Sequence, residues 1–181
     1  MIIEQTSLRD CFVIKPQIFR DERGYFLESF NHLKFQKSTG LSVQFVQDNL
    51  SKSNKGVLRG LHFQIEEYEQ AKLVWVIKGS VLDVCVDLRQ NSETFGHYFS
   101  IILDDRSHKQ LFIPKGFAHG FLTLEDETIF AYKCDNFYHK PSERGIVYND
   151  KTLNIDWDFP EHQIILSEKD AQLPTFENFF K

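Results

Sequence analysis

The feature that most constrains the fold is a series of short, evenly spaced apolar segments in the middle of the chain. Residues 73–77 and 81–88 are runs of β-branched and apolar side chains separated by Lys78-Gly79-Ser80, a combination that indicates a β-hairpin. Further segments of strand character follow at short intervals, at residues 98–103, 110–113, 120–124 and 128–134. Short strands separated by turn residues are typical of a β-sandwich or β-barrel, so we expect a mainly β protein.

Helix signals are few. The segment from Asn31 to about Ser38 has the polar start of a short helix, and Gly40 provides its end. A second helical turn is expected to begin at Ser167. The fold prediction is therefore a β-rich domain with a few short helices.

Strand alternation gives the segment 81–88 one polar face. Asp83, Cys85 and Asp87 project to one side, because successive strand side chains point in opposite directions. In a barrel this face would line a pocket, whereas in a sandwich it could equally face solvent, and the pattern leaves both interpretations open. Tyr132 points among apolar neighbours on its own strand, where its hydroxyl needs a partner, either structural or catalytic.

Length and composition describe one globular domain. A chain of 181 residues with 41% hydrophobic and 26% charged residues can close a sizeable core, to which 18 Phe contribute rigid rings. The formal net charge of −5 argues against general binding to nucleic acid or anionic membranes. Any phosphate recognition must therefore come from a local group of cations.

The cysteines indicate a reducing compartment. Cys11, Cys85 and Cys134 are odd in number and widely spaced, which fits free thiols rather than disulfides or a zinc site. The start of the chain carries Glu4 where a signal peptide would carry base, and no apolar run approaches the roughly 18 residues of a membrane span. We expect a cytoplasmic protein that does not cross a membrane.

One segment combines three groups that suit a carbonyl-bearing anion. Arg59-Gly60-Leu61-His62-Phe63-Gln64 is followed by Lys72. An Arg fork can bind phosphate, a neutral His can accept a proton near pH 7, and a Lys can stabilise the oxyanion formed beside a carbonyl. This set suggests an epimerase or isomerase, although a short segment with one Arg and one His also occurs in proteins where it has no such role.

A second motif indicates the type of barrel. The segment 114–120 has the spacing Pro-x-Gly-x-x-His, ending in His119 and Gly120, and resembles the second half of the cupin signature, which belongs to a small jelly-roll barrel. In the nearest match to the first half, Gln64 stands where metal-binding cupins have a second His. Two imidazoles fall short of the three-ligand sets of mononuclear catalytic sites, so we expect no metal.

Together these motifs resemble the dTDP-4-dehydrorhamnose 3,5-epimerase family, and the resemblance covers nearly the whole chain. The segments that carry it are, in chain order, residues 23–29, 46–49, 59–64, 70–74, 84–89, 113–120, 132–133, 148–150 and 166–170. Several independent motifs in family order make a chance match implausible, although each alone would be weak. The resemblance implies a single cupin-like jelly-roll domain over residues 1–181.

The resemblance also implies the reaction and its catalytic residues. The substrate would be dTDP-4-keto-6-deoxy-D-glucose, inverted at carbons 3 and 5 on the way to dTDP-L-rhamnose. His62 matches the general base, Tyr132 the general acid and Lys72 the group that stabilises the enolate. Asp170 matches the acid that orients His62; from spacing alone, Ser167-x-x-Asp170 is better interpreted as an ordinary helix-capping box.

Further residues are implied in substrate binding. They are Arg23, Glu28, Gln47, Asn49, Arg59, Lys72, His119, Glu143 and Lys169, with Asp48 at a backbone or sugar-hydroxyl contact and Tyr138 as an aromatic lining residue. Arg23 and Arg59 would clamp the diphosphate, since planar guanidinium forks suit phosphate oxygens. The segment 65–69 departs from the family pattern by carrying acidic residues, and we expect it to point away from the site.

The resemblance implies a cofactor-free homodimer whose amino-terminal strands cross between subunits. The apolar segment 176–181 is expected to pack on the body or on a partner subunit. Three alternatives stay open: an epimerase that inverts carbon 3 alone, a metal-dependent cupin oxygenase, and a sugar-binding cupin without catalytic activity. The last has no need for a base, an acid and a lysine together.

Overall fold

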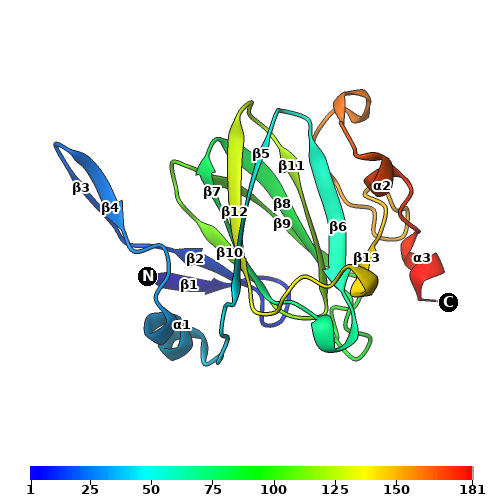
Figure 1. Ribbon diagram of the computed structural model, residues 1–181, viewed down its shortest axis with the longest axis horizontal. Helices are drawn as coiled ribbons and strands as arrows, with labels where there is room; N and C mark the ends of the chain where they lie inside the picture. Colours follow the sequence, from blue (N-terminus) through cyan, green and yellow to red (C-terminus); the bar gives the residue numbers. More distant parts are fainter. Residues whose placement is uncertain (181) are drawn as a thin grey trace.

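Two antiparallel sheets face each other in a computed structural model that describes residues 1–180 (Figure 1). The six-stranded sheet has the order β1 (Ile2–Gln5), β2 (Phe12–Lys15), β10 (Gln110–Ile113), β7 (Lys72–Lys78), β12 (Thr128–Cys134) and β5 (Gln47–Ser53). The five-stranded sheet has the order β13 (Glu143–Gly145), β6 (Leu58–Gln64), β11 (Phe117–Thr123), β8 (Ser80–Asp87) and β9 (Tyr98–Asp104). The mainly β prediction is confirmed, and the form is an open cupin-like sandwich rather than a closed barrel.

The helices are short, and α1 and α2 begin where the sequence predicts. Helix α1 (His32–Thr39) is capped by the side chain of Asn31 and ends at Gly40, which has the left-handed conformation. Helix α2 (Glu168–Ala171) is capped by Ser167. The remaining helical turns are α3 (Phe176–Phe179), η1 (Glu66–Tyr68), η2 (Lys140–Ser142) and η3 (Glu161–Gln163).

The predicted hairpin between β7 and β8 is wrong. Gly79 makes the expected tight turn with φ +84°, but the two strands then lie in different sheets. Both edges of β7 are occupied by β10 and β12, and both edges of β8 by β11 and β9. A turn signal predicts a change of chain direction; it does not decide which strand becomes the hydrogen-bonded neighbour.

Strand β11 also differs from the prediction, because it begins at Phe117 rather than at Gly120. Pro114 and Gly116 form the preceding turn, in which Gly116 has φ +77°. The extended conformation resumes directly after this glycine. His119 therefore lies inside the strand, paired on either side with β6 and β8.

The polar face of β8 does not meet solvent. Asp83, Cys85 and Asp87 are all fully buried. Cys85 belongs to the apolar core between the sheets, and Asp87 is bound by the guanidinium of Arg89. The interpretation as a solvated sandwich face is wrong, and Asp83 lies behind the wall of the cavity described below.

Aromatic packing covers part of each outer face of the sandwich. Phe35 of α1 packs against Phe112 on the outside of the six-stranded sheet. Along the five-stranded sheet, Phe176 is buried, and Phe179 and Phe180 pack against the same cluster. The described part of the carboxy-terminal segment thus packs on the body of the chain, as expected.

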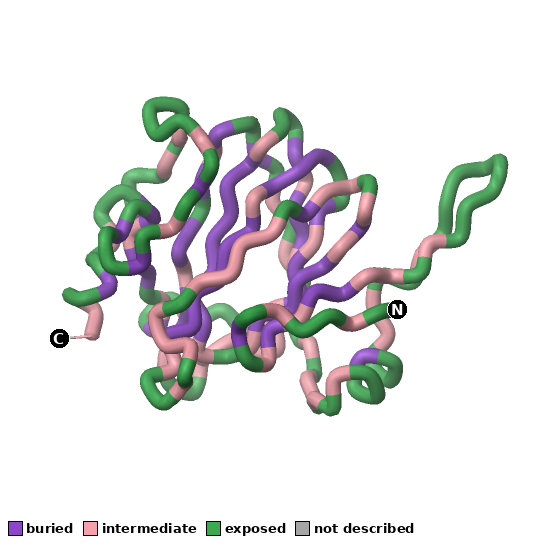
Figure 2. Tube along the Cα trace, turned by 180° about the vertical axis from the view of Figure 1, so that it is seen from behind, coloured by how far each residue is buried: buried purple, intermediate pink, exposed green. Residues whose placement is uncertain are grey.

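One element leaves the body of the molecule. The ribbon of β3 (Ile18–Asp21) and β4 (Gly24–Leu27) extends away from the two sheets (Figures 1 and 2). Its side chains Phe19, Tyr25 and Phe26 are exposed, Phe26 to 67%. Among residues 1–180, no helix has the length and apolar character needed to span a membrane.

Candidate active site

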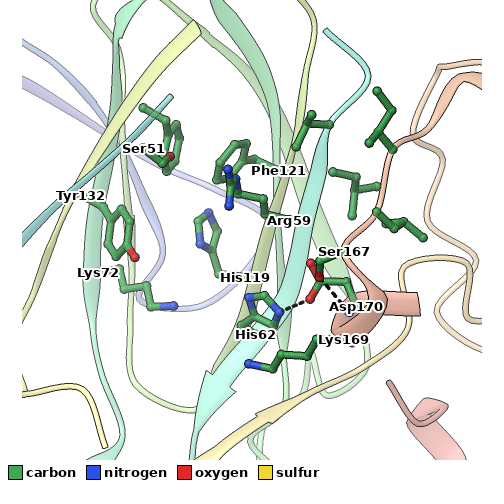
Figure 3. A pocket seen from close by; sticks show the side chains of 15 residues that line it. Ser51, Arg59, His62, Lys72, His119, Phe121, Tyr132, Ser167, Lys169 and Asp170 are labelled. Atoms are coloured by element: carbon green, nitrogen blue, oxygen red, sulfur yellow. Dashed lines mark hydrogen bonds and ion pairs between the residues drawn. The ribbon is translucent and has the colours of Figure 1, made fainter. Parts of the chain in front are cut away.

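A cavity of 420 Å³ opens between the two sheets, and all four catalytic residues implied by the sequence line it (Figure 3). Strands β5, β7 and β12 form one wall, strands β6 and β11 form the other, and residues 165–170 close the side. The polar side chains that line it are Ser51, Arg59, His62, Lys72, His119, Tyr132, Ser167, Lys169 and Asp170.

An irregularity in β6 brings Arg59 and His62 to the same cavity. Strict alternation would send residues three positions apart to opposite faces of a strand. Along the pair of β6 and β11, however, His119 pairs with His62 and Phe121 pairs with Arg59, so β6 carries one extra residue in this interval. The extra residue resets the alternation, and both side chains line the cavity.

A glycine is required at the irregularity. Gly60 has φ +119°, and a Cβ at this position would lie 2.5 Å from the Cα of Gly120. The two strands approach closely here because neither residue has a side chain. Gly60 and Gly120 thus permit the geometry that directs Arg59 and His62 inward.

His62 and Asp170 form a close pair on one side of the cavity. The Nε2 atom of His62 lies 2.6 Å from Oδ1 of Asp170, and the Asp170 side chain is only 6% exposed. Burial disfavours the ionised carboxyl, but the hydrogen bond and charge of His62, together with Ser167 and Lys169, outweigh burial and hold the pKa of Asp170 below its ordinary value. The backbone N–H of Asp170 also donates to Oγ of Ser167 at 3.1 Å. Asp170 is therefore both the residue that Ser167 caps and the partner of His62.

Lys72 and Tyr132 lie on the opposite wall from His62 (Figure 3). Desolvation lowers the pKa of Lys72, and the carboxylates of Asp83 and Glu143 oppose this shift. Desolvation raises the pKa of Tyr132, against the opposing charge of Arg59. The tyrosine is thus a protonated phenol over a wide pH range, facing a lysine whose ammonium is easier to deprotonate than usual.

His119 projects from β11 on the same wall as His62 and has a carboxylate behind it. Its Nε2 is 2.9 Å from Oδ2 of Asp83, which is fully buried. The sequence motif identified His119 but assigned no role to Asp83. The alternating polar residues of β8 were the signal that could have identified it, since a buried carboxylate usually has a specific partner.

A smaller cavity of 250 Å³ adjoins the first and shares His62, Lys72 and Tyr132 with it. The other implied binding residues that line this cavity are Gln47, Asn49, Tyr138 and Glu143.

Glu143, which lines the smaller cavity, is bonded to side chains from two other segments. Its Oε2 accepts from the Tyr138 hydroxyl at 2.9 Å and pairs with Lys169 Nζ at 2.6 Å. Burial opposes ionisation of Glu143, but these two partners lower its pKa overall.

Three implied binding residues are not among those that line either cavity. Arg23 is at the tip of the β3–β4 ribbon, 85% exposed and paired with Asp21. Glu28 pairs with Lys34 at 2.8 Å. Asp48 is 71% exposed and pairs with Lys133. Within one chain, the structure brings the implied catalytic residues together but leaves these side chains outside.

The acidic segment 65–69 does not line either cavity. Gln64 stabilises the turn of this segment, because its Nε2 donates a hydrogen bond to the carbonyl of Tyr68 at 2.7 Å. Tyr68 in turn stacks on His139 with ring centroids 3.7 Å apart.

Over residues 1–180, the structure contains no group of three or more His, Cys, Asp or Glu side chains arranged to hold a metal ion.

Comparison with known proteins identifies the family. A family profile described as dTDP-4-dehydrorhamnose 3,5-epimerase matches residues 5–178. The chain belongs to this epimerase family. It is accordingly an isomerase, as the motifs around His62 and His119 imply.

The family relationship extends over the full length of related epimerases. The dTDP-4-dehydrorhamnose 3,5-epimerase of Shigella flexneri is 51% identical over 170 residues, which are 94% of this chain and 93% of the relative. The crystal structure of the enzyme from Elizabethkingia anophelis NUHP1 is 52% identical with a TM-score of 0.95, covering 98% of this chain and 97% of the other.

A second epimerase structure contains a sugar nucleotide. The 3,5-epimerase from Legionella pneumophila Philadelphia 1, solved in complex with dTDP-4-keto-L-rhamnose, is 46% identical with a TM-score of 0.93. The similarity covers 97% of this chain and 93% of that one. The predicted family and the cupin-like fold are therefore confirmed.

Proposed function

We propose that this protein converts dTDP-4-keto-6-deoxy-D-glucose to dTDP-4-keto-L-rhamnose, and that His62, Tyr132 and Lys72 carry out the proton transfers. The observation that carries the proposal is the placement of a His–carboxylate pair and a protonated phenol on opposite walls of one cavity. Carbons 3 and 5 both flank the C4 ketone, so each C–H bond can be broken with its electrons moving to the C4 oxygen. The dTDP-sugar chemistry of the related epimerases supports this substrate.

His62 is the proposed base. Its neutral ring removes the proton from one face of the sugar, and Asp170 stabilises the imidazolium that results, because its carboxylate has a pKa below the ordinary value. The 2.6 Å contact also fixes the orientation of the ring. The imidazolium then returns its proton to solvent before the next inversion.

Tyr132 is the proposed acid and Lys72 the enolate partner. The phenol donates a proton to the face opposite His62, which completes the inversion, and the phenolate regains a proton from solvent. The Lys72 ammonium neutralises charge that develops on the C4 oxygen, an effect worth about 3 kcal/mol of barrier in comparable sites. The proposed contacts with the rest of the sugar nucleotide come from Arg59, His119, Glu143 and Lys169, which line the two cavities.

The test is hydrogen exchange during turnover. Incubation of the protein with the 4-keto sugar nucleotide in deuterated water should place deuterium at both carbon 3 and carbon 5 of the product. Deuterium at carbon 3 alone would show an epimerase that inverts only that carbon. Absence of deuterium at both positions would refute the proposed reaction.

We also infer that the chain forms one domain and acts as a homodimer, as is typical of the family. Two features support the dimer: the exposed aromatic side chains of the β3–β4 ribbon, and the position of Arg23 outside the cavities of its own chain. A ribbon that reaches a second copy would carry Arg23 toward that copy's diphosphate site. Three free, buried cysteines support a cytoplasmic location, where thiols stay reduced.

A further inference from the structure

Asp83 is a buried carboxylate whose partners do not explain its burial. Its side chain is fully buried, and Oδ2 contacts Nε2 of His119 at 2.9 Å. Its other oxygen, Oδ1, is buried without a hydrogen-bond partner among the described residues. Burying a carboxylate costs several kcal/mol unless it is well paired, so this arrangement makes a poor contribution to folding.

Two other buried carboxylates show what a structural role looks like in this chain. Asp87 accepts hydrogen bonds from Arg89, Ser92 and Thr94. Asp150 accepts from the backbone N–H groups of residues 152, 153 and 176. Each has several partners, none of which lines the cavity between the sheets. The one partner that the structure gives Asp83 is a side chain of the candidate active site.

The contact determines which atom of His119 can meet a ligand. Because Nε2 faces the carboxylate, the proton of a neutral ring is held on Nε2, and Nδ1 is the nitrogen left for another group. Packing restricts the ring further, since it stacks on Phe130 with centroids 6.1 Å apart and an interplanar angle of 20°. In Figure 3, the His119 ring projects from the wall that carries His62 and is drawn between the side chains of His62 and Tyr132.

We propose that Asp83 is a positioning residue of the epimerisation, which acts through His119 by holding its ring with Nε2–H toward the carboxylate and Nδ1 available to the sugar. A neutral ring held in this way accepts a hydrogen bond at Nδ1, and a sugar hydroxyl is the donor that the substrate offers. This inference depends on the substrate-binding role proposed for His119. It adds a second His–carboxylate pair to the site, beside His62 and Asp170.

The kinetic test compares Asp83→Asn with Asp150→Asn, a control at an equally buried carboxylate outside the cavity. We expect Asp83→Asn to lower kcat/KM about 10- to 100-fold, the range known for removal of the carboxylate that orients a metal-binding His. Asp150→Asn should lower the Tm while kcat/KM stays within about twofold of wild type. An Asp83→Asn protein that folds and matches wild-type kinetics would overturn the proposal.

A double-mutant cycle separates action through His119 from a general structural effect. If Asp83 acts through His119, then adding Asp83→Asn to His119→Gln should cause no further loss of kcat/KM. Losses that multiply would show that Asp83 acts independently, and the positioning role would be wrong. Both kinetic tests require that the wild-type protein first incorporates deuterium as proposed above. If the wild-type protein does not, the proposed reaction fails; if it does but the Asp83 variants behave otherwise than expected, only the positioning role fails.

A measurement on the wild-type protein covers the case in which Asp83→Asn does not fold. Imidazole ¹⁵N spectra, with His119 assigned by the signal lost in His119→Gln, report which ring nitrogen carries the proton. We expect a proton on Nε2 with the downfield shift of a hydrogen bond to carboxylate. A neutral ring protonated on Nδ1 alone would contradict the proposal.

Discussion

His62 Nε2 lies 2.6 Å from Asp170 Oδ1, although 108 positions of the chain separate the two residues. The parallel bridge between Val57 and Ile165 brings the carboxy-terminal segment alongside the start of β6. From there, α2 directs Asp170 toward the cavity while Ser167 caps the same helix. One short segment thus provides both a helix start and the partner of the proposed base.

Replacing Asp170 by Asn should separate these two roles. The backbone N–H of residue 170 still donates to Ser167, so the fold is retained, but the imidazolium of His62 loses its anionic partner. We expect kcat to fall by about 10² to 10⁴, as for other His–Asp pairs. Thr175→Ala removes the cap of the equally short α3 and serves as a control, with a small loss of stability and unchanged kcat. Activity of Asp170→Asn near the wild-type level would exclude the orienting role.

Removing the Tyr132 hydroxyl should uncouple exchange from inversion. In Tyr132→Phe, His62 can still remove and return a proton on one face, whereas donation to the other face is lost. We expect solvent deuterium to enter the unreacted sugar while epimerised product falls by at least about 10², the effect of a general acid. Tyr148→Phe, which removes a hydroxyl bonded to Glu161, is the matched control. Normal product formation by Tyr132→Phe would assign the acid to another group.

The pKa of Lys72 should set the alkaline limit of activity. Desolvation lowers the pKa of this ammonium, so the charged form that stabilises the enolate is lost as pH rises through that lowered value. Desolvation raises the pKa of Tyr132, which favours its protonated form as pH rises. In Lys72→Arg the cation persists, and we expect the alkaline limb of the kcat profile to move to higher pH even if kcat is lower. An unmoved limb would show that a different group titrates.

The position of Arg23 predicts complementation between inactive variants. If the β3–β4 ribbon serves the site of a second copy, a mixed dimer of Arg23→Ala and His62→Ala contains one site with both wild-type residues. Unfolding and refolding the two variants together should restore part of the wild-type activity, up to about a quarter of the total by random pairing. Each variant refolded alone provides the baseline, and a mixture no better than that baseline would place Arg23 in its own chain's function.

Asp87 should carry much of the acid sensitivity of the fold. Burial raises its pKa, but hydrogen bonds from Arg89, Ser92 and Thr94 outweigh burial and lower it to about 2. Its unfolded pKa is about 3.9, so ionised Asp87 contributes about 2 kcal/mol above pH ~4, and the contribution is lost as pH falls toward 2. Urea unfolding should show Asp87→Asn far less stable than wild type at pH 6, with the gap shrinking at pH 3. A gap independent of pH would contradict this account.

The sequence by itself determined where α1 and α2 begin and which family the chain belongs to. Asn31, Gly40 and Ser167 set the ends of helices through caps that involve near neighbours in the chain. The motifs around His62 and His119 identified the family because they preserve residue types at fixed spacing. Such features depend on a few consecutive residues, so they can be interpreted without knowing what packs against them.

Tertiary structure decided what depends on distant strands. Only the pairing of β6 with β11 shows the extra residue at Gly60, which turns Arg59 and His62 to the same cavity against simple alternation. Only the sheet order shows that β7 and β8 belong to opposite sheets. The burial of Asp83 behind His119 follows from these same long-range pairings. Strand partners compete through hydrogen bonds and packing across the whole chain, and no local pattern records which partner wins.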